Sequence, residues 1–426
     1  MTTLVLLGSL LVFLILGVPI AMSLGLSSAI VMVFMTDQSM MSLALKFAHT
    51  MKVYPLLAIP FFILAGTLMS TGGVAKRMIN FAIAGVGHFR GGLAMATVLA
   101  CALFAAVSGS SPATVLAIGP IVIGAMISSG YSKEFAAGVI CNAGTLGILI
   151  PPSIVMVVYA SVTQTSVGKL FMAGVVPGIL LTILMMLAIY IVTRKMDIEY
   201  FPKASLREVL RTGKEALWGL MLIVIIMGGI YAGIFTPTEA AAVSAVYALV
   251  VVVFVYKDLK LNEVPKVLTQ SAKLTVALMF IIANAYVFAF VLTTEQIPQT
   301  AAEMVLSSGL SPWMFLLVVN LLLLVAGNFI DPTSVILIVV PIIFPIAMNL
   351  GIDPIHLGII MVINMEIGLV TPPVGLNLFV TSGVTGLTLV EMIYAALPWL
   401  LLLLGALMLI TYVPVISTFL PNMVFD

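Results

Sequence analysis

Charged residues are scarce in this chain. Lys, Arg, Asp and Glu together make up 8% of the 426 residues, whereas 62% are hydrophobic and the mean hydropathy is +1.29. Because soluble domains carry about 25% charged residues, this composition excludes a soluble globular protein and indicates a chain that crosses the membrane many times. The net charge of +1 gives no reason to expect nucleic acid or another polyanion as a partner.

Residues that enzymes commonly use are also rare. Cysteine occurs only at Cys101 and Cys141, in apolar runs without the spacing of a metal site or a disulfide framework. Histidine occurs three times, and no HExxH, GxSxG or phosphate-loop motif is present. We therefore expect the chain not to be an enzyme. No basic region precedes the first apolar run, so we expect an uncleaved span there and not a signal peptide.

Apolar runs of about 20 residues, long enough to cross a bilayer, recur along the chain. Two longer apolar regions, 91–127 and 310–349, are each interrupted near the middle by a proline-containing polar motif. We interpret each as a re-entrant hairpin with a non-helical tip, which is tolerated at membrane depth only inside protein or beside a wet cavity. Single spans are expected at 3–19, 20–36, 55–72, 135–163, 170–193, 216–236, 238–256, 274–293, 357–386 and 393–419.

Two segments about 220 residues apart carry the same pattern of prolines and glycines. Ser-Gly-Ser-Ser-Pro at 108–112 matches Asn-Phe-Ile-Asp-Pro at 328–332, and the Gly-x-x-x-Pro-Pro at 147–152 matches the one at 368–373. Because proline interrupts helices, the spans that contain the Pro-Pro pairs are expected to be discontinuous. Paired segments of this kind in two halves of a membrane protein are typical of a transporter's binding site.

The distribution of charge predicts opposite orientations for the two halves. Basic residues flank the first hairpin, whereas no Lys or Arg follows Lys273. By the positive-inside rule the first hairpin opens to the cytoplasm. The second hairpin is flanked by Glu295, Glu303 and Asp353 and is expected to open to the other side. The chain is therefore expected to be an inverted repeat.

The expected fold is an all-α polytopic membrane protein built from two repeats. The first repeat covers 1–193, with scaffold helices in 1–72, the hairpin at 91–127 and the broken helix at 135–163. A cytoplasmic interfacial arm covers 194–215. The second repeat covers 216–426, with scaffold helices in 216–293, the hairpin at 310–349, the broken helix at 357–386 and a final helix at 393–419. The polar segments 38–53, 195–214 and 257–273 are expected as interfacial helices or as plain loops.

Uncharged oxygen ligands gather at the hairpin tips and helix breaks. Unwound backbone frees carbonyl oxygens there, and an oxygen shell of this kind suits a small hard cation such as Na⁺. The half-helices that begin at the same places direct positive dipole ends at the region, which suits a carboxylate. Alternatively, the small residues and prolines only permit close helix packing. The hydroxyls concerned are those of Ser108, Ser110, Ser111, Thr114, Ser153, Thr333, Ser334 and Thr371.

Several polar residues in apolar sequence have an expected role in the site or in the fold. A carboxylate at the membrane centre costs about 2.5–3.5 kcal/mol, so Asp331 is expected to have a partner and to line the site. Glu366 either acts directly or is a protonated packing residue or a brace for the break. Asn142 and Asn364 are expected to hold unwound backbone by side-chain hydrogen bonds. Glu239 is expected to complete a capping box with Thr236, and not to carry protons.

Four motifs together resemble the large membrane (M) subunit of tripartite ATP-independent periplasmic (TRAP) transporters, and the resemblance covers essentially the whole chain. More distantly, the paired hairpins and Thr-Pro-Pro breaks resemble the divalent anion/sodium symporters. The motifs are Ser-Gly-Ser-Ser-Pro-Ala-Thr at 108–114, Asn-Ala-Gly-Thr-Leu-Gly-Ile-Leu-Ile-Pro-Pro-Ser at 142–153, Gly-Ile-Phe-Thr-Pro-Thr-Glu-Ala-Ala-Ala at 233–242 and Glu-Ile-Gly-Leu-Val-Thr-Pro-Pro-Val-Gly-Leu-Asn at 366–377.

The resemblance implies Na⁺-coupled import of an organic acid, sialic acid or a C4-dicarboxylate, across the bacterial inner membrane by an elevator mechanism. It also implies two protein partners besides the membrane lipids: a small four-helix (Q-type) membrane subunit and a periplasmic solute-binding protein, neither of which is part of this chain. One alternative is a stand-alone Na⁺- or H⁺-coupled organic anion symporter or exchanger. Another is a channel or a structural component of an assembly.

The resemblance further implies which residues hold the ligands, many of them through backbone carbonyls. Substrate contacts fall between the tips, at Ser110, Ser153 and Asp331. The implied Na⁺ ligands are Ser108, Ser110, Gly147, Ile150 and Pro152 in the first half and Asp331, Thr333, Met365, Gly368 and Val370 in the second.

Overall fold

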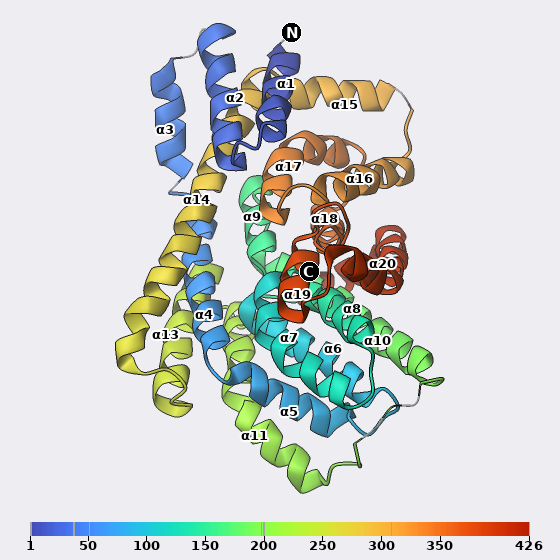
Figure 1. The fold of residues 1–426 in the computed structure, drawn as a ribbon. Helices are drawn as coiled ribbons and strands as arrows, with labels where there is room; N and C mark the ends of the chain where they lie inside the picture. The colour runs from blue at the N-terminus through green and yellow to red at the C-terminus, as the bar shows by residue number, and fades with distance from the viewer. Residues whose placement is uncertain are drawn as a thin grey trace.

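All regular structure in the described residues is helical (Figure 1). A computed structural model describes residues 2–36, 39–50, 52–196, 198, 201–307 and 309–425. Eight helical stretches are long and apolar enough to cross a membrane, and further apolar helices of 10–17 residues accompany them. The prediction of an all-α polytopic protein is confirmed.

The helices follow one another with short connections. Up to residue 193 they are α1 (Thr2–Ile15), α2 (Ile20–Phe34), α3 (Met40–Thr50), α4 (Ala58–Thr71), α5 (Val74–Val86), α6 (Gly92–Ser108), α7 (Ser111–Ser128), α8 (Lys133–Ala143), α9 (Ile154–Thr163) and α10 (Val167–Thr193). After it they are α11 (Leu206–Ile223), α12 (Gly229–Tyr231), α13 (Pro237–Val250), α14 (Val264–Thr294), α15 (Ile297–Ser307), α16 (Pro312–Gly327), α17 (Pro332–Asn349), α18 (Pro354–Gly368), α19 (Leu376–Thr385), α20 (Leu389–Tyr412) and α21 (Val415–Phe425).

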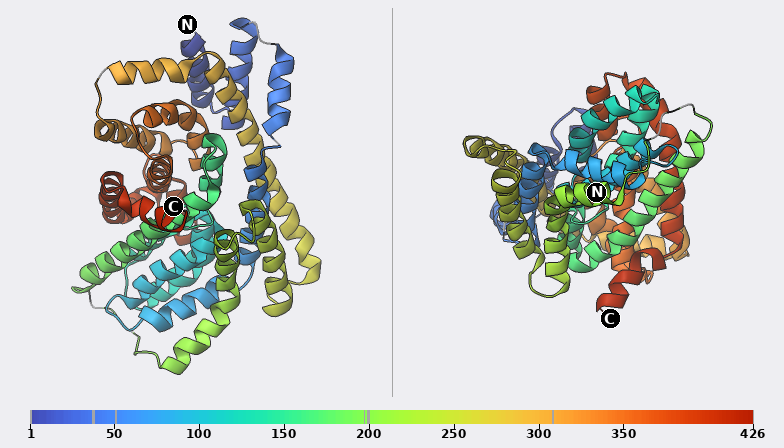
Figure 2. Two further views of the ribbon diagram at one scale, coloured as in Figure 1. Left: turned by 180° about the vertical axis from the view of Figure 1, so that it is seen from behind. Right: turned by 90° about the horizontal axis from the view of Figure 1, so that it is seen from below.

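The helices form two packed groups that lie side by side in Figures 1 and 2. In one group α4 packs against α13 and α14, and α14 also packs against α2. In the other group the pairs α6–α7 and α16–α17 pack against the helices that contain the Pro-Pro breaks. Helix α17 contacts α14, so the second hairpin lies where the two groups meet.

The first half contains a helical hairpin with a short tip and an interrupted span at the expected places. Helix α6 is composed largely of small residues and is almost wholly buried, which allows neighbouring backbones to approach closely. It ends at Ser108 with Gly109 as its C-cap, and α7 begins at Ser111 with Pro112 in its first turn, where a missing N–H costs nothing. Helix α8 passes into a 3₁₀ turn, η2 (Gly144–Ile148), and the chain is non-helical until α9. The predicted interruption of this span is confirmed.

The second half repeats this arrangement. Helix α16 ends at Gly327, and α17 begins at Pro332 with Asp331 as its N-cap. Helix α18 ends at Gly368, and the chain is non-helical until α19 begins at Leu376. The peptide bonds within both Pro-Pro pairs are cis. The second predicted interruption is also confirmed.

Helix boundaries differ from those expected at the polar segments and at the C-terminus. Helices α11 and α14 take in the ends of 195–214 and 257–273 and continue into the apolar runs. In α11 the single Gly213 at the junction is tolerated within the helix, and in α14 neither proline nor glycine lies at the junction. The final helix expected at 393–419 is divided into α20 and α21 before Pro414, because proline disfavours helical backbone in the residue before it. Within the polar segments 38–53 and 195–214, the positions of Gln38, Met51, Asp197, Glu199 and Tyr200 lie outside the described residues.

Glu239 has the predicted capping role. Thr236 N donates to Glu239 Oε2 at 2.8 Å, and Glu239 N donates to Thr236 Oγ1 at 3.3 Å. These reciprocal bonds satisfy two N–H groups at the start of α13. The carboxylate is therefore used to begin a helix, which confirms the prediction.

Candidate functional site

The tip of the first hairpin is pressed against the first helix break. Gly109 has a φ of 60°, a conformation that glycine adopts without strain. A Cβ added to Gly109 would lie 2.8 Å from the carbonyl oxygen of Pro152, and one added to Gly147 would lie 2.7 Å from that of Ser110. Both distances are too short for a side chain, so this contact requires glycine on each side.

Oxygen atoms without formal charge converge at this tip. Ser108 Oγ lies 3.0 Å from Thr114 Oγ1, and both hydroxyls contact the carbonyl oxygen of Ser110, at 3.3 and 2.9 Å. The carbonyl oxygens of Ile150 and Pro152 accept no hydrogen bond from any described residue. Hydroxyl groups and freed carbonyls are the donors that broken membrane helices offer to Na⁺. The predicted first set of ligands therefore fits this ion by its chemistry.

The two serines predicted to contact substrate differ in accessibility. Ser110 is partly exposed, and as N-cap of α7 its side chain makes no capping bond. Ser153 is fully buried; its hydroxyl donates to the carbonyl oxygen of Ile148 at 2.5 Å and accepts from Met156 N at 3.4 Å. In this conformation the Ser110 hydroxyl is open to a ligand, whereas the Ser153 hydroxyl is engaged at the start of α9.

The second hairpin tip meets the second break through an equivalent contact. A Cβ added to Gly368 would lie 2.8 Å from the carbonyl oxygen of Gly327. Next to this contact, Val374 N donates to the carbonyl oxygen of Asn328 at 3.2 Å. Each half thus holds its hairpin tip against its own break at the glycine that precedes the Pro-Pro pair.

The second predicted ligand set keeps fewer free oxygen atoms than the first. The carbonyl oxygens of Met365 and Gly368 accept from Leu369 N at 3.2 Å and Thr371 N at 3.3 Å. The Val370 carbonyl and the hydroxyl of the buried residue Thr333 have no hydrogen-bond partner among the described residues. Because a carbonyl oxygen has two lone pairs, Met365 and Gly368 retain capacity for a cation, and Val370 and Thr333 are unused.

Asp331 finds its partner within its own helix. One carboxylate oxygen accepts from Ser334 N at 3.1 Å, and the other accepts from the Ser334 hydroxyl. These bonds make Asp331 the N-cap of α17, where a negative charge also interacts favourably with the helix dipole. The residue is partly exposed, so its carboxylate remains accessible to a ligand at the tip.

Asn328 was not among the residues predicted from the sequence. Its side-chain oxygen Oδ1 is buried at the second tip and has no hydrogen-bond partner among the described residues. Asn328 lies 220 residues after Ser108, so it is the repeat equivalent of a predicted ligand of the first half. The regular offset between the two segments was the signal that could have identified it.

Beside the helix breaks, two hydrogen bonds between side chains of the described residues join the first half directly to the second. Thr145 Oγ1 donates to Glu366 Oε1 at 2.7 Å, and both residues are fully buried. Asn377 Nδ2 donates to Ser111 Oγ at 2.7 Å. The two broken helices and the first hairpin are therefore linked in one polar and closely packed assembly.

Asn142 and Asn364 do not hold the unwound backbone, so that prediction is wrong. Asn142 Nδ2 donates one turn back to the Gly138 carbonyl at 3.0 Å and to the Ala396 carbonyl at 3.4 Å. Asn364 Nδ2 donates to Asn320 Oδ1 at 2.7 Å and to the Ile360 carbonyl at 2.8 Å. Both residues lie in regular helix, so their amides reach neighbouring helices instead of the breaks.

No group of three or more His, Cys, Asp and Glu side chains in the described part of the chain is placed to hold a metal ion. A cation at the hairpin tips would therefore rely mainly on hydroxyl, amide and carbonyl oxygens. Such a shell suits a monovalent ion, because divalent ions in proteins usually take several carboxylates.

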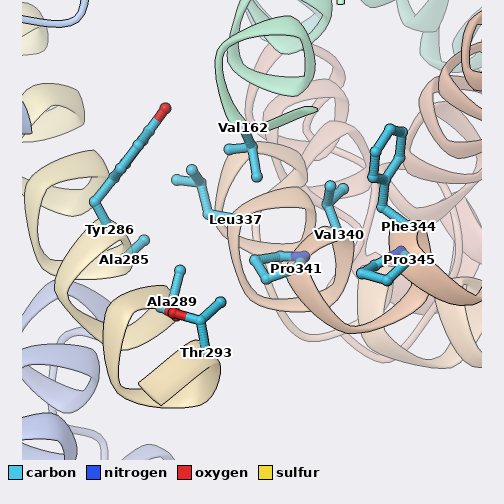
Figure 3. A pocket seen from close by; sticks show the side chains of 10 residues that line it. All are labelled: Val162, Ala285, Tyr286, Ala289, Thr293, Leu337, Val340, Pro341, Phe344 and Pro345. Atoms are coloured by element: carbon cyan, nitrogen blue, oxygen red, sulfur yellow. The ribbon is translucent and has the colours of Figure 1, made fainter. Parts of the chain in front are cut away.

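A separate cavity of about 240 Å³ lies between α14 and α17, with Val162 of α9 at its side (Figure 3). Its polar side chains are Tyr286 and Thr293, and no charged residue lines it. It has no basic residue and no helix N-terminus to balance the charge of a carboxylate. It marks incomplete packing between the second hairpin and α14, and we do not assign it to the substrate.

The sequence family described as tripartite ATP-independent periplasmic transporter, DctM component, matches residues 7–416. The chain is 65% identical over 400 residues to the C4-dicarboxylate TRAP transporter large permease protein DctM of Pseudomonas aeruginosa, covering 94% of both chains. It is 57% identical over 430 residues to the protein of that name from Vibrio cholerae, covering 96% of this chain and 95% of that one.

Other similarities are more distant. The sialic acid TRAP transporter large permease protein SiaM of Vibrio cholerae is 38% identical over 370 residues, covering 87% of each chain. The crystal structure of the Alcanivorax borkumensis YdaH transporter aligns with a TM-score of 0.67 at 14% identity, covering 97% of this chain and 99% of that one. The last similarity concerns the fold alone.

Proposed function

Because this chain belongs to the DctM component family of tripartite ATP-independent periplasmic transporters, we propose that it is the large subunit that carries an organic acid across the inner membrane with Na⁺. It is a multi-pass membrane permease and not an enzyme. The observation that carries the Na⁺ proposal is the pair of hairpin tips, each held by a glycine contact against a break that offers uncharged oxygens.

The substrate class we propose is a C4-dicarboxylate. The relatives at 65% and 57% identity are named for these substrates, whereas the relative named for sialic acid is 38% identical. A dicarboxylate is also compatible with the tips, because the starts of α7, α9 and α19 provide N–H groups for its two carboxylates. Ser110 is the proposed side-chain donor, and Ser153 would contribute through the start of α9.

The proposed Na⁺ sites are the two predicted ligand sets with one addition. In the first half we retain Ser108, Ser110, Gly147, Ile150 and Pro152. In the second half we retain Asp331, Thr333, Met365, Gly368 and Val370, and we add Asn328 because its buried Oδ1 lacks a donor. Asp331 is proposed to contribute its charge to the region between the tips.

We also propose that the two halves are inverted repeats and that transport follows an elevator mechanism. The repeats would be 1–193 and 216–426, joined by the arm at 194–215. Equivalent hairpins and breaks, together with the loss of basic residues after Lys273, support opposite orientations. The division into two packed helix groups supports a moving unit and a scaffold, and the cavity between α14 and α17 lies where they would slide.

The proposed partners are a periplasmic solute-binding protein and a small four-helix membrane subunit. Transporters of this family are tripartite, and this chain matches the DctM component over nearly its full length. The surrounding membrane lipids cover its exposed apolar helices. With partners of this kind, substrate is delivered by the binding protein and crosses the membrane through this chain.

The test is uptake of a radiolabelled dicarboxylate such as succinate into proteoliposomes that contain this chain and its small membrane subunit. We expect accumulation only with an inward Na⁺ gradient and only when the cognate binding protein is added. Equal uptake without the binding protein would support a stand-alone symporter instead. Equilibration without accumulation would indicate a channel.

A further inference from the structure

We propose that the hydrogen bond between Thr145 and Glu366 couples the two cation sites, so that occupation of one site raises the affinity of the other. The inference rests on the proposed function, since it takes the two hairpin tips to be Na⁺ sites. It assigns Glu366 a positioning role between the sites and no contact with the ion.

The two bonded residues occupy equivalent places in the two halves. Thr145 lies two residues before Gly147, and Glu366 lies two residues before Gly368. Thr145 Oγ1 donates to Glu366 Oε1 at 2.7 Å. The residues that precede the two breaks thus meet each other directly, and the bond joins the backbone segments that carry the proposed ligands.

Each of these glycines is in close contact with its own hairpin tip. The Cβ positions of Gly147 and Gly368 lie 2.7 and 2.8 Å from carbonyl oxygens of the two tips. A displacement of a tip when an ion binds must therefore displace its glycine, because close-packed interiors transmit strain. The path from one tip to the other then has five steps: first tip to Gly147, along the chain to Thr145, across the hydrogen bond to Glu366, along the chain to Gly368, and on to the second tip.

The bond to Thr145 is the one side-chain interaction of Glu366 among the described residues. Glu366 is fully buried, its second oxygen Oε2 has no hydrogen-bond partner, and no ion pair is formed by it within the described chain. Two other ionisable groups are engaged elsewhere: Tyr159 of α9 donates to the Pro354 carbonyl, and His356, on the same helix as Glu366, contacts Ser417. The Thr145 hydroxyl also lies 2.6 Å from the Asn142 carbonyl oxygen, so its single proton is shared between this oxygen and Glu366 Oε1. Thr145 is therefore held in place in the first half, and Glu366 in the second half has no other described partner that could replace it.

The test is equilibrium binding of radiolabelled sodium to the purified complex with its small membrane subunit, measured by scintillation proximity without substrate. We expect wild-type protein to bind with a Hill coefficient above one. Thr145→Val, which removes the hydroxyl at nearly constant volume, should lower this coefficient to about one. It should also raise the Na⁺ concentration for half-saturation about fivefold or more, which is the lower end of the usual range of coupling between sites.

Three controls separate coupling from a general loss of packing. Thr145→Ser keeps the hydroxyl and should restore cooperative binding, and Glu366→Gln keeps an oxygen acceptor and should also remain cooperative. Thr97→Val makes the same chemical change at a buried threonine of α6. Among the described residues, the Thr97 hydroxyl bonds only to the Leu93 carbonyl and to Met126 Sδ, away from both breaks. This variant should bind sodium as the wild type does. Where Thr145→Val does not fold, Thr145→Ala and Glu366→Leu remove the same bond.

Two contrary outcomes have different meanings. Cooperative binding with an unchanged half-saturation in Thr145→Val and Glu366→Leu would overturn the coupling and leave the cation sites intact. Absence of sodium binding in the wild type would overturn the proposed Na⁺ sites themselves, and the coupling with them.

Discussion

Asp331 combines a structural and a proposed functional role at one residue. Its carboxylate caps α17 through Ser334, and it is also the charged group at the tip where the other half has the neutral Ser111. Substitution by alanine removes both roles together. A variant that keeps the cap and removes only the charge is therefore required.

We predict that Asp331→Asn abolishes Na⁺-dependent uptake and lowers the free energy of unfolding by only about 0.3–1 kcal/mol, because asparagine can still cap the helix and loses only the interaction of the charge with the helix dipole. Asp331→Ala should also lose uptake and, without the cap, should lower the free energy of unfolding by about 1 kcal/mol more. Uptake assays and thermal unfolding of the purified variants measure the two effects. Wild-type uptake by Asp331→Asn would remove the carboxylate from the transport site.

We predict that Ser108→Ala and Asn328→Ala each raise the Na⁺ concentration for half-maximal uptake about tenfold, which corresponds to about 1.4 kcal/mol per lost ligand. The two residues are repeat equivalents, so their effects should be similar in size. Ser128→Ala, at an exposed serine that bonds only the Ala125 carbonyl among the described residues, is the matched control. An unchanged Na⁺ titration in Asn328→Ala would restrict the second site to the other residues.

At the residue scale the sequence predicted where hydroxyl groups gather better than it predicted the hydrogen bonds that they make. The serines and threonines at 108–114 could be recognised because hydroxyls next to a proline break are unusual in apolar sequence. Which carbonyls are free, as at Val370, depends on local backbone hydrogen bonds that no residue type encodes. The engagement of Ser153 with Ile148 could not be predicted for the same reason.

At the scale of elements, the contact between each hairpin and its break depends on glycine. We predict that Gly147→Ala lowers the free energy of unfolding by about 1–3 kcal/mol, because its Cβ would lie 2.7 Å from the Ser110 carbonyl. Gly124→Ala in α7 is the control: nothing lies within 4 Å of its added Cβ, so it should stabilise by about 0.5–1 kcal/mol. Equal stability of the two variants in thermal unfolding would show that the tip and the break are not in close contact.

The elements themselves could largely be predicted, because prolines and glycines mark where helices stop. Both discontinuous helices and the capping box before α13 follow from such residues. Helix continuation was harder to predict: α14 runs through a charged segment into an apolar one, since charge alone does not end a helix. The short helix α5 was not predicted, because its 13 residues mix basic and apolar side chains.

At the scale of the whole molecule, the proposed inversion of the two halves makes a prediction about topology. In a background without Cys101 and Cys141, cysteine at position 90 should react with an impermeant thiol reagent from the cytoplasm. Cysteine at position 303 should react from the periplasm, because the two hairpins are proposed to open to opposite sides. Labelling of both positions from one side would contradict the inverted repeat.

The central claim is that the two hairpin tips and helix breaks form one site that moves Na⁺ and an organic acid together. The most direct measurement is the simultaneous flux of radiolabelled sodium and radiolabelled succinate into proteoliposomes with the binding protein present. We predict that sodium enters only with succinate, in a fixed ratio above one, because each tip is proposed to hold an ion. Uptake of succinate with no accompanying sodium flux would contradict the account.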